Sequence, residues 1–238
     1  MTSDTERGIT AIAALDQPLR RDVYRLLAEP DTWVGRDEAA EALGVPRSVA
    51  AFHLDKLVEA GLAEARFERR TGRSGPGAGR PAKLYRRASG EASASVPERH
   101  YDLAGELMVR AIAASVRSGS PVDEQLAEVA RSAGRAAGAE RAAPSDEADP
   151  GGRRAAVLAA LAAHGYEPVR RDDGEIVLRN CPFHRLAEED RPLVCGMNLD
   201  YLQGCLEGAE ATGALTARLA PETGYCCVRL SERPVGAG

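Results

Sequence analysis

Cysteine and histidine side chains that could bind a metal lie close together in the last third of the sequence. All five cysteines of this 238-residue chain come after residue 180. Cys181 and His184 form a C-x-x-H pair, a spacing that lets both side chains reach one metal ion from a single tight turn. An odd number of cysteines, without a signal-peptide pattern, argues against a disulfide framework. The clustering therefore predicts a metal site.

The other cysteines divide into further candidate ligands and packing residues. Cys195 follows a short predicted helix, and Cys226 and Cys227 lie in a predicted strand near the end of the chain. Adjacent strand residues point to opposite faces, so we assign Cys226 to the site and Cys227 to the core. Cys205 lies between two leucines on a predicted helix, which is typical of a small buried hydrophobe. The predicted ligands are Cys181, His184, Cys195 and Cys226.

Three thiolates and one imidazole form a closed tetrahedral ligand set, which suits a structural zinc ion. The same donors also suit an iron–sulfur cluster, which binds cysteine thiolates and can accept a different ligand among them. A third interpretation is that the four residues pack in a core without a metal. A fourth makes Cys195 a thiol nucleophile with His184 as its base. No third residue that would orient the base is evident, so we do not expect an enzyme.

The elements around these residues predict a small α+β domain over residues 153–232. Asp172, Asp173 and Gly174 are typical of a hairpin turn between two strands. A second pair of strands follows near the end of the domain, and the two hairpins could join in one antiparallel sheet. The predicted helices are 153–164, 184–190 and 196–211, and the predicted strands are 167–171, 175–179, 214–219 and 225–230.

A turn followed by an amphipathic helix organises the first part of the chain. Pro46 suits the first turn of a helix, and Gly61 suits its C-terminal end. A short predicted helix, 36–43, precedes the turn. Two helices joined in this way can place the second one in the major groove of DNA. The apolar face of the second helix carries Ala50, Leu54, Leu57 and Val58.

The other face of this helix supplies candidate contacts to DNA. Arg47, Ser48 and Phe52 lie there, and an arginine, a hydroxyl and an aromatic ring can bind base edges or the thymine methyl group. The residue types and their place in the first turns of the helix predict a sequence-reading surface.

A basic segment follows the helix. Residues 66–87 hold eight basic side chains and one acid, whereas the whole chain has a net charge of −5. A concentrated basic patch on an acidic protein is typical of local phosphate binding. We interpret the segment as a hairpin with a Gly/Pro-rich loop, and a solvated loop is the alternative. The predicted phosphate contacts are Arg69, Arg70, Arg80 and Lys83.

The stretches LDQPLRRDVYRLLAEP, VPRSVAAFHLDKLVEAGL and GRPAKLY together resemble the winged-helix repressors of the ArsR type. The last stretch, followed by a cysteine-bearing C-terminal half, looks more narrowly like the SufR-like iron–sulfur regulators of that group. The resemblance implies a winged helix-turn-helix domain over residues 9–88. It also implies a repressor that binds a double-stranded DNA operator and holds an iron–sulfur cluster on its C-terminal cysteines. A regulator with a structural zinc and a small-molecule signal is the alternative.

Two predicted helices, 98–118 and 122–141, lie between linkers at 89–97 and 142–152. We assign region 98–141 to homodimerisation, because helix-turn-helix proteins commonly pair to bind two half-sites. Packing as a satellite of the core is the alternative. The expected fold class is therefore α+β, with the winged domain, the helical region and the C-terminal domain in that order. No apolar run has the length of a membrane span, so we expect a cytoplasmic protein without membrane contact.

Overall fold

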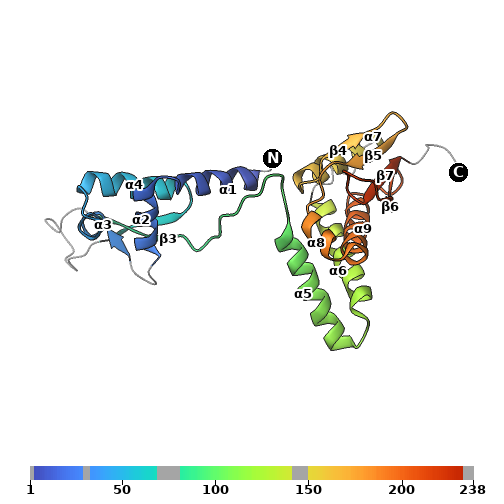
Figure 1. The fold of residues 1–238 in the computed structure, drawn as a ribbon, viewed down its shortest axis with the longest axis horizontal. Coiled ribbons are helices and arrows are strands. Elements are labelled where there is room, and N and C mark those ends of the chain that lie inside the picture. The colour runs from blue at the N-terminus through green and yellow to red at the C-terminus, as the bar shows by residue number, and fades with distance from the viewer. Residues whose placement is uncertain (1–2, 29–32, 69–80, 141–149, 233–238) are drawn as a thin grey trace. The chain divides into compact units, whose positions relative to one another are not determined.

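The computed structural model describes residues 3–28, 33–68, 81–140 and 150–232. The chain divides into two compact units, Ser3–Ala94 and Ser95–Gly238 (Figure 1). The two regions predicted at 98–141 and 153–232 thus fall in one unit. Each unit has its own apolar core.

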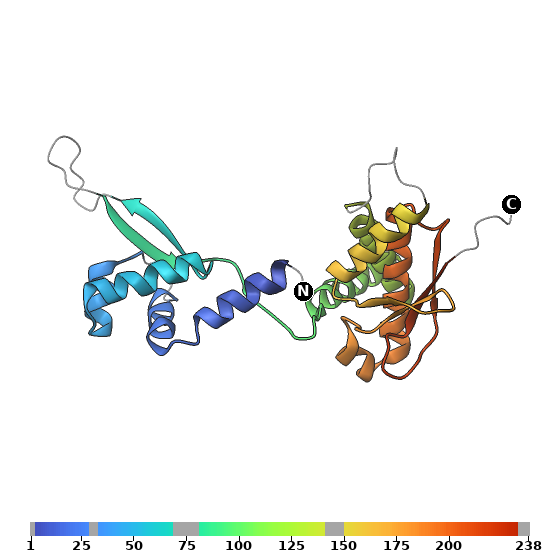
Figure 2. The same cartoon turned by 90° about the horizontal axis from the view of Figure 1, so that it is seen from above.

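The N-terminal unit holds helices followed by a small sheet. Its elements are α1 (Ser3–Ala14), α2 (Pro18–Leu27), β1 (Val34–Gly35), α3 (Arg36–Leu43), α4 (Arg47–Glu59), β2 (Ala63–Glu68) and β3 (Ala82–Arg87). The strands form an antiparallel sheet in the order β1-β3-β2. The long hairpin of β2 and β3 is the pair of cyan and green arrows in Figure 2.

Local signals explain where α3 and α4 begin and end. α3 ends at Leu43 and is capped by Gly44, whose φ of 64° lies in the left-handed region that favours glycine. Pro46 then precedes the first residue of α4 and supplies the fixed φ that a helix start accepts. The predicted apolar face of α4 is buried, since Ala50, Leu54 and Leu57 are 0% exposed. α4 therefore leaves its opposite face free of the core.

The C-terminal unit combines five helices in the described residues with one antiparallel sheet of order β4-β5-β7-β6. Strands from both predicted hairpins join in this sheet. The helices are α5 (Tyr101–Ser118), α6 (Val122–Ala139), α7 (Pro150–Ala163), α8 (His184–Glu189) and α9 (Arg191–Gly208) together with the short turns around them. The strands are β4 (Pro168–Arg170), β5 (Glu175–Leu178), β6 (Leu215–Leu219) and β7 (Val228–Glu232).

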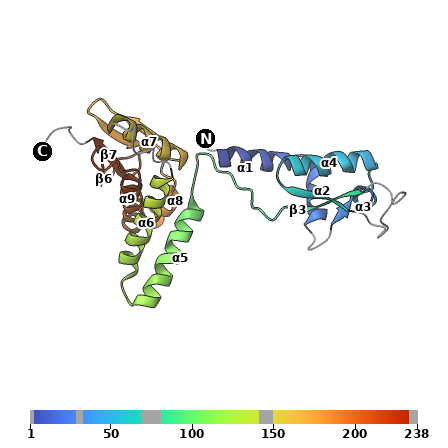
Figure 3. The same ribbon diagram turned by 180° about the vertical axis from the view of Figure 1, so that it is seen from behind.

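α6 and α9 lie side by side at unusually close range (Figure 3). A Cβ atom added to Gly134 of α6 would lie 2.0 Å from the carbonyl oxygen of Tyr201. One added to Gly204 of α9 would lie 2.1 Å from the carbonyl oxygen of Arg131. Only glycine lets two helix backbones approach this closely. α6 is therefore part of the core of this unit, and α5 is the outer helix of the α5–α6 hairpin.

Two of the element boundaries that differ from the sequence prediction affect the cysteines. α9 begins at Arg191 instead of residue 196, because the Asp190 side chain accepts a 3.0 Å hydrogen bond from the Leu193 amide and caps the helix. Cys195 therefore lies inside α9. β7 begins at Val228 instead of residue 225, so Cys226 and Cys227 precede the strand. The alternation of faces along a strand does not apply to that pair.

Candidate nucleic-acid interface and cysteine cluster

Four thiols interact in the C-terminal unit, and we call them the cysteine cluster: Cys181, Cys195, Cys226 and Cys227. The Cys181 and Cys226 thiols form one hydrogen-bonded pair, and the Cys195 and Cys227 thiols form another. An electrostatic interaction between Cys181 and Cys195 connects the two pairs. Cys181 comes from the turn before α8, Cys195 from α9, and the other two from the segment before β7.

The four thiols of the cysteine cluster form two pairs, Cys181 with Cys226 and Cys195 with Cys227. Among the described residues, no group of three or more His, Cys, Asp or Glu side chains is positioned to hold a metal ion. The chemistry of the donors suits a metal that prefers thiolates. Metal binding by the cysteine cluster therefore stays a prediction.

Burial and mutual hydrogen bonding separate the pKa values of these thiols. The hydrogen bond from Cys226 lowers the pKa of the Cys181 thiol, and the charge of Arg99 adds to this effect. The same hydrogen bond, together with burial, raises the pKa of Cys226 well above its ordinary value. Burial, followed by the hydrogen bond with Cys227, raises the pKa of Cys195 to about 12. Cys195 is therefore a poor thiol nucleophile, because nucleophilic attack requires the thiolate.

His184 and Cys205 lie in different surroundings. The His184 side chain is 60% exposed, and its Nε2 atom lies 3.4 Å from the Glu188 carboxylate on the next turn of α8. Within the described residues it is Cys227, and not His184, that interacts with the other thiols. Cys205 is 4% exposed in the apolar core, where the sequence places it as a packing residue.

Two buried asparagines lie beside cysteines of the cluster, Asn198 in contact with Cys226 and Asn180 next to Cys181 in the chain, and the sequence analysis missed them. The Asn198 amide nitrogen donates a 3.2 Å hydrogen bond to the Cys226 sulfur, and the Tyr166 hydroxyl donates to the Asn198 amide oxygen. The Asn180 amide nitrogen donates a 2.9 Å bond to the carbonyl of Glu98. Asn198 lies between Met197 and Leu199 in α9, and a polar residue between apolar neighbours was the available signal, because buried amides need partners.

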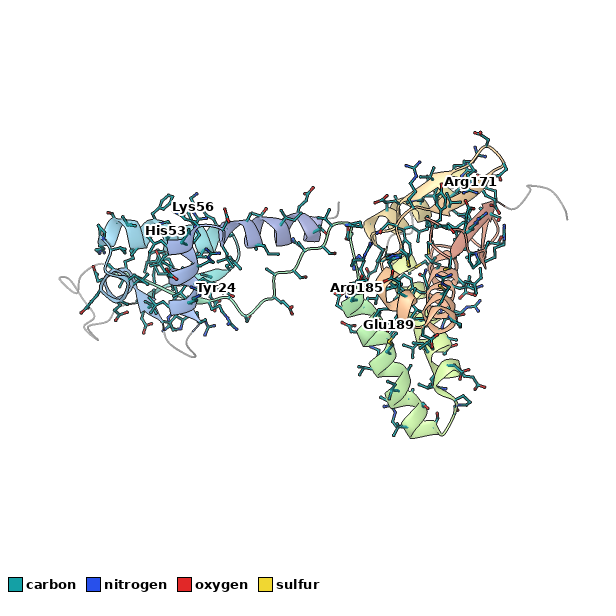
Figure 4. The ribbon with its side chains drawn as sticks, viewed as in Figure 1. Tyr24, His53, Lys56, Arg171, Arg185 and Glu189 are labelled. Carbon is teal, nitrogen blue, oxygen red and sulfur yellow. The ribbon has the colours of Figure 1, made fainter. Side chains whose placement is uncertain are left out.

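In the N-terminal unit, the exposed face of α4 carries the predicted base contacts. Ser48 is exposed, and the Phe52 ring is 53% exposed. The Lys56 ammonium lies 5.9 Å from the centre of that ring; Lys56 and its neighbour His53 are labelled in Figure 4. The Arg47 Nε atom forms a 2.6 Å ion pair with Asp37, and both side chains are mostly exposed. An exposed pair of this kind contributes about 0–1 kcal/mol, so Arg47 can leave it for another partner.

Asp55 joins α4 to the hairpin. Its carboxylate accepts hydrogen bonds of 2.7 Å from the Lys83 ammonium and 2.7 Å from the Tyr85 hydroxyl, both on β3. Arg36 of α3 donates a third, at 2.9 Å. Burial alone would raise the pKa of Asp55, but the hydrogen bonds from Lys83 and Tyr85 outweigh burial and hold the pKa below its ordinary value. Burial and the bond to Asp55 raise the pKa of Tyr85 to about 12.

This junction bears on the predicted phosphate contacts. Lys83 is engaged with Asp55 and its side chain is only 24% exposed. Arg69, Arg70 and Arg80 lie outside the described residues. The other basic side chains of the hairpin are partly neutralised within it, because Arg66 forms an ion pair with Glu68 and Arg86 with Glu64.

Trp33 forms a further contact that the sequence analysis missed. The guanidinium of Arg66 lies 4.2 Å from the centre of the Trp33 ring, and that of Arg86 lies 4.7 Å from it. The face of an aromatic ring attracts a guanidinium group, so the Trp33 ring helps to hold both arginine side chains in position. The basic strands are thereby held in place beside β1.

Residues 15–66 match a helix-turn-helix domain. The match covers α2, α3 and α4 and extends into β2. No curated protein matches the chain, and no solved structure matches it either. In the described residues, none of the helices is both long enough and apolar enough to cross a lipid bilayer.

The match assigns α3 and α4 to the two helices of a helix-turn-helix motif. α4 is the second helix of the motif, and its exposed face carries Arg47, Ser48 and Phe52. Second helices of such motifs are the ones that enter the major groove. A domain of this type is found in DNA-binding transcription regulators, and the surface of α4 is compatible with that role.

Proposed function

We propose that this chain is a sequence-specific DNA-binding transcription regulator that acts as a repressor. The observation that carries the proposal is the helix-turn-helix domain, whose second helix exposes a cation, a hydroxyl and an aromatic ring to solvent. The apolar face of α4 is buried, so its outer face is available for DNA. Arg47, Ser48 and Phe52 would read base edges and thymine methyl groups.

The hairpin of β2 and β3 would act as the wing of this domain. Its basic side chains stand out in a chain whose net charge is −5. Phosphate contacts hold a protein in register on DNA and bind all sequences alike. Arg69, Arg70 and Arg80 would supply such contacts. Lys83, through Asp55, would instead fix the wing to the reading helix.

Control by the cysteine cluster is the second part of the proposal. Four thiols from three separate segments are a donor set for an iron–sulfur cluster or for zinc. Cys181, Cys195 and Cys226 would be ligands as predicted, and the contacts of Cys227 make it a better fourth candidate than His184. Binding of the metal or cluster would change the charge of the site and the positions of its thiols. If it is zinc, the site is structural and the signal is a small ligand.

Enrichment of DNA from a pool of random duplexes by the full-length protein tests the first part. We expect one recurrent sequence motif, made of two related half-sites if the protein acts as a homodimer. If the selected duplexes share no motif, and the amount bound depends only on the DNA concentration, sequence-specific binding is rejected. Arg69→Ala, Arg70→Ala and Arg80→Ala should each flatten the salt dependence of binding by about one unit if the residue contacts a phosphate.

The absorption spectrum and metal content of anaerobically purified protein test the second part. Visible absorbance with bound iron and sulfide supports a cluster. Stoichiometric zinc in a colourless protein supports the structural alternative. Protein that binds neither after reconstitution would reject control through a metal.

A further inference from the structure

α5 exposes large apolar side chains on the face that points away from its own unit. Val109 is 66% exposed, Ile112 is 54% exposed and Val116 is 80% exposed. The opposite face of the helix is buried, since Ala104 and Leu107 are 0% exposed. A helix that packs on one neighbour needs only one apolar face. The second face of α5 therefore has no counterpart in the described part of this chain.

The spacing of the exposed residues is that of a helix-pairing seam. Gly105, Val109, Ile112 and Val116 follow one another at steps of four, three and four residues. These steps are the spacing of the core positions of a coiled coil. We call these four residues the α5 stripe. The sequence of steps is the same in both directions, so the stripe can face a second copy of itself in antiparallel orientation.

The shapes of the four positions also suit an antiparallel pair. A two-fold axis halfway along the stripe sets Val109 opposite Ile112 of the second copy, and Val116 opposite Gly105. A Cβ added to Gly105 would meet no atom within 4 Å, so the space above this glycine is open. The Val116 side chain, the most exposed of the three, can enter that space.

The residues beside the α5 stripe carry no charge that would repel a second copy. Met108, Ala113 and Ser115 flank it and carry no charge. Nearby, Arg110 forms a 3.1 Å ion pair with Glu106 on the same helix, so the two charges offset each other locally. Two copies can approach without placing like charges opposite one another.

We propose that the α5 stripe is the contact through which two copies of this chain associate, with their α5 helices antiparallel about a two-fold axis between Val109 and Ile112. The inference rests on the proposed function, because a DNA-binding regulator that recognises two half-sites acts as a pair. Its geometric basis is α5 alone. A closed two-fold contact uses the same surface on both copies, which a self-complementary stripe satisfies.

Sedimentation of the full-length protein over a range of concentrations tests the proposal. We expect a reversible monomer–dimer equilibrium for the parent chain. Ile112→Asp places a charge at the centre of the seam and should leave a monomer with the circular dichroism spectrum of the parent. Leu219→Asp is the matched control, because Leu219 is also exposed, at 45%, but lies on β6. A monomeric parent, or an Ile112→Asp variant that remains dimeric, would overturn the proposal.

The orientation has its own test. Gly105→Cys protein and Val116→Cys protein, mixed and oxidised, should form a disulfide between the two different chains. Cross-linking of each variant with itself, without the mixed product, would indicate a parallel pair and reject the antiparallel arrangement. DNA binding is measured separately on a duplex with one half-site. A dimeric parent that binds no DNA would reject the proposed function and leave the stripe standing, whereas a monomer that binds one half-site would do the reverse.

Discussion

The amide nitrogen of Asn198 lies 3.2 Å from the thiol sulfur of Cys226 and donates a hydrogen bond to it. Asn198 is 1% exposed, and its amide oxygen accepts from the buried Tyr166 hydroxyl. Both ends of this side chain are therefore satisfied inside the core. The contact fixes the orientation of one thiol of the cysteine cluster.

Replacing this asparagine should be costly. Asn198→Ala leaves the Tyr166 hydroxyl buried without its acceptor and removes the donor to Cys226. We expect the free energy of unfolding of the C-terminal unit to fall by about 1–3 kcal/mol. Denaturant unfolding of the full chain measures it. Gln203→Ala, on the same helix but only half-buried, is the control. Equal stability of the two variants would show that the Asn198 bonds contribute nothing of their own.

Arg47→Ala should weaken binding to the enriched DNA motif by about 1–3 kcal/mol and leave binding to unrelated DNA nearly unchanged, because base contacts carry the sequence preference. The companion variant is Asp37→Asn, which releases Arg47 from its ion pair without removing it. That variant should bind at least as tightly as the parent. Titrations on both duplexes at one salt concentration make the comparison. An equal loss on both would assign Arg47 to the DNA backbone.

Asp55→Ala should loosen the attachment of the hairpin to α4. Tyr85 is 0% exposed and loses the acceptor of its hydroxyl, which costs about 1–3 kcal/mol. Lys83 is released at the same time, so the salt dependence of DNA binding should become steeper by up to about one unit if the ammonium then reaches a phosphate. Thermal unfolding and binding at several salt concentrations test the two effects. The single variant Lys83→Ala is the control. It also breaks the contact with Asp55 but removes the ammonium, so it should not steepen the salt dependence.

Cys195→Ser should abolish retention of the metal or cluster if the proposed control site is right, whereas Cys205→Ser and His184→Ala should keep it. Cys195 interacts with Cys227 and Cys181, while Cys205 lies in the core and His184 contacts Glu188. Metal analysis of the three variants side by side decides this. If the site is also the sensor, operator affinity should change by about 1–3 kcal/mol on metal loss. Metal loss without a change in affinity would leave a structural site.

Acid should destabilise the N-terminal unit through His53. Burial, and then the charge of Arg20, lowers the pKa of His53 below its ordinary value of 6.5. The unfolded chain therefore binds the proton more readily than the folded one. Stability attributable to the neutral imidazole is fully present above pH 6.5 and is lost as the pH falls from 6.5 toward the lower pKa of the folded state. Melting temperatures across this range measure it, and the pH dependence should be weaker in His53→Leu.

The sequence determined the elements whose signals are local. Pro46, Gly61 and the apolar residues between them predicted helix α4 and its buried face, because capping and helical periodicity act within a few turns. Helix α3 coincides with the predicted range 36–43 for the same reason. The residue types also predicted that cysteines would gather, although not how they would pair.

Only the tertiary structure decided which thiols meet. That depends on where α9 and β7 begin, and a cap at Asp190 and a late strand start at Val228 moved both boundaries. Cys227 therefore joins Cys195, while His184 turns to Glu188. The engagement of Lys83 by Asp55 likewise joins residues 28 positions apart. Contacts of this kind arise when separate elements pack, and no periodicity within one element encodes them.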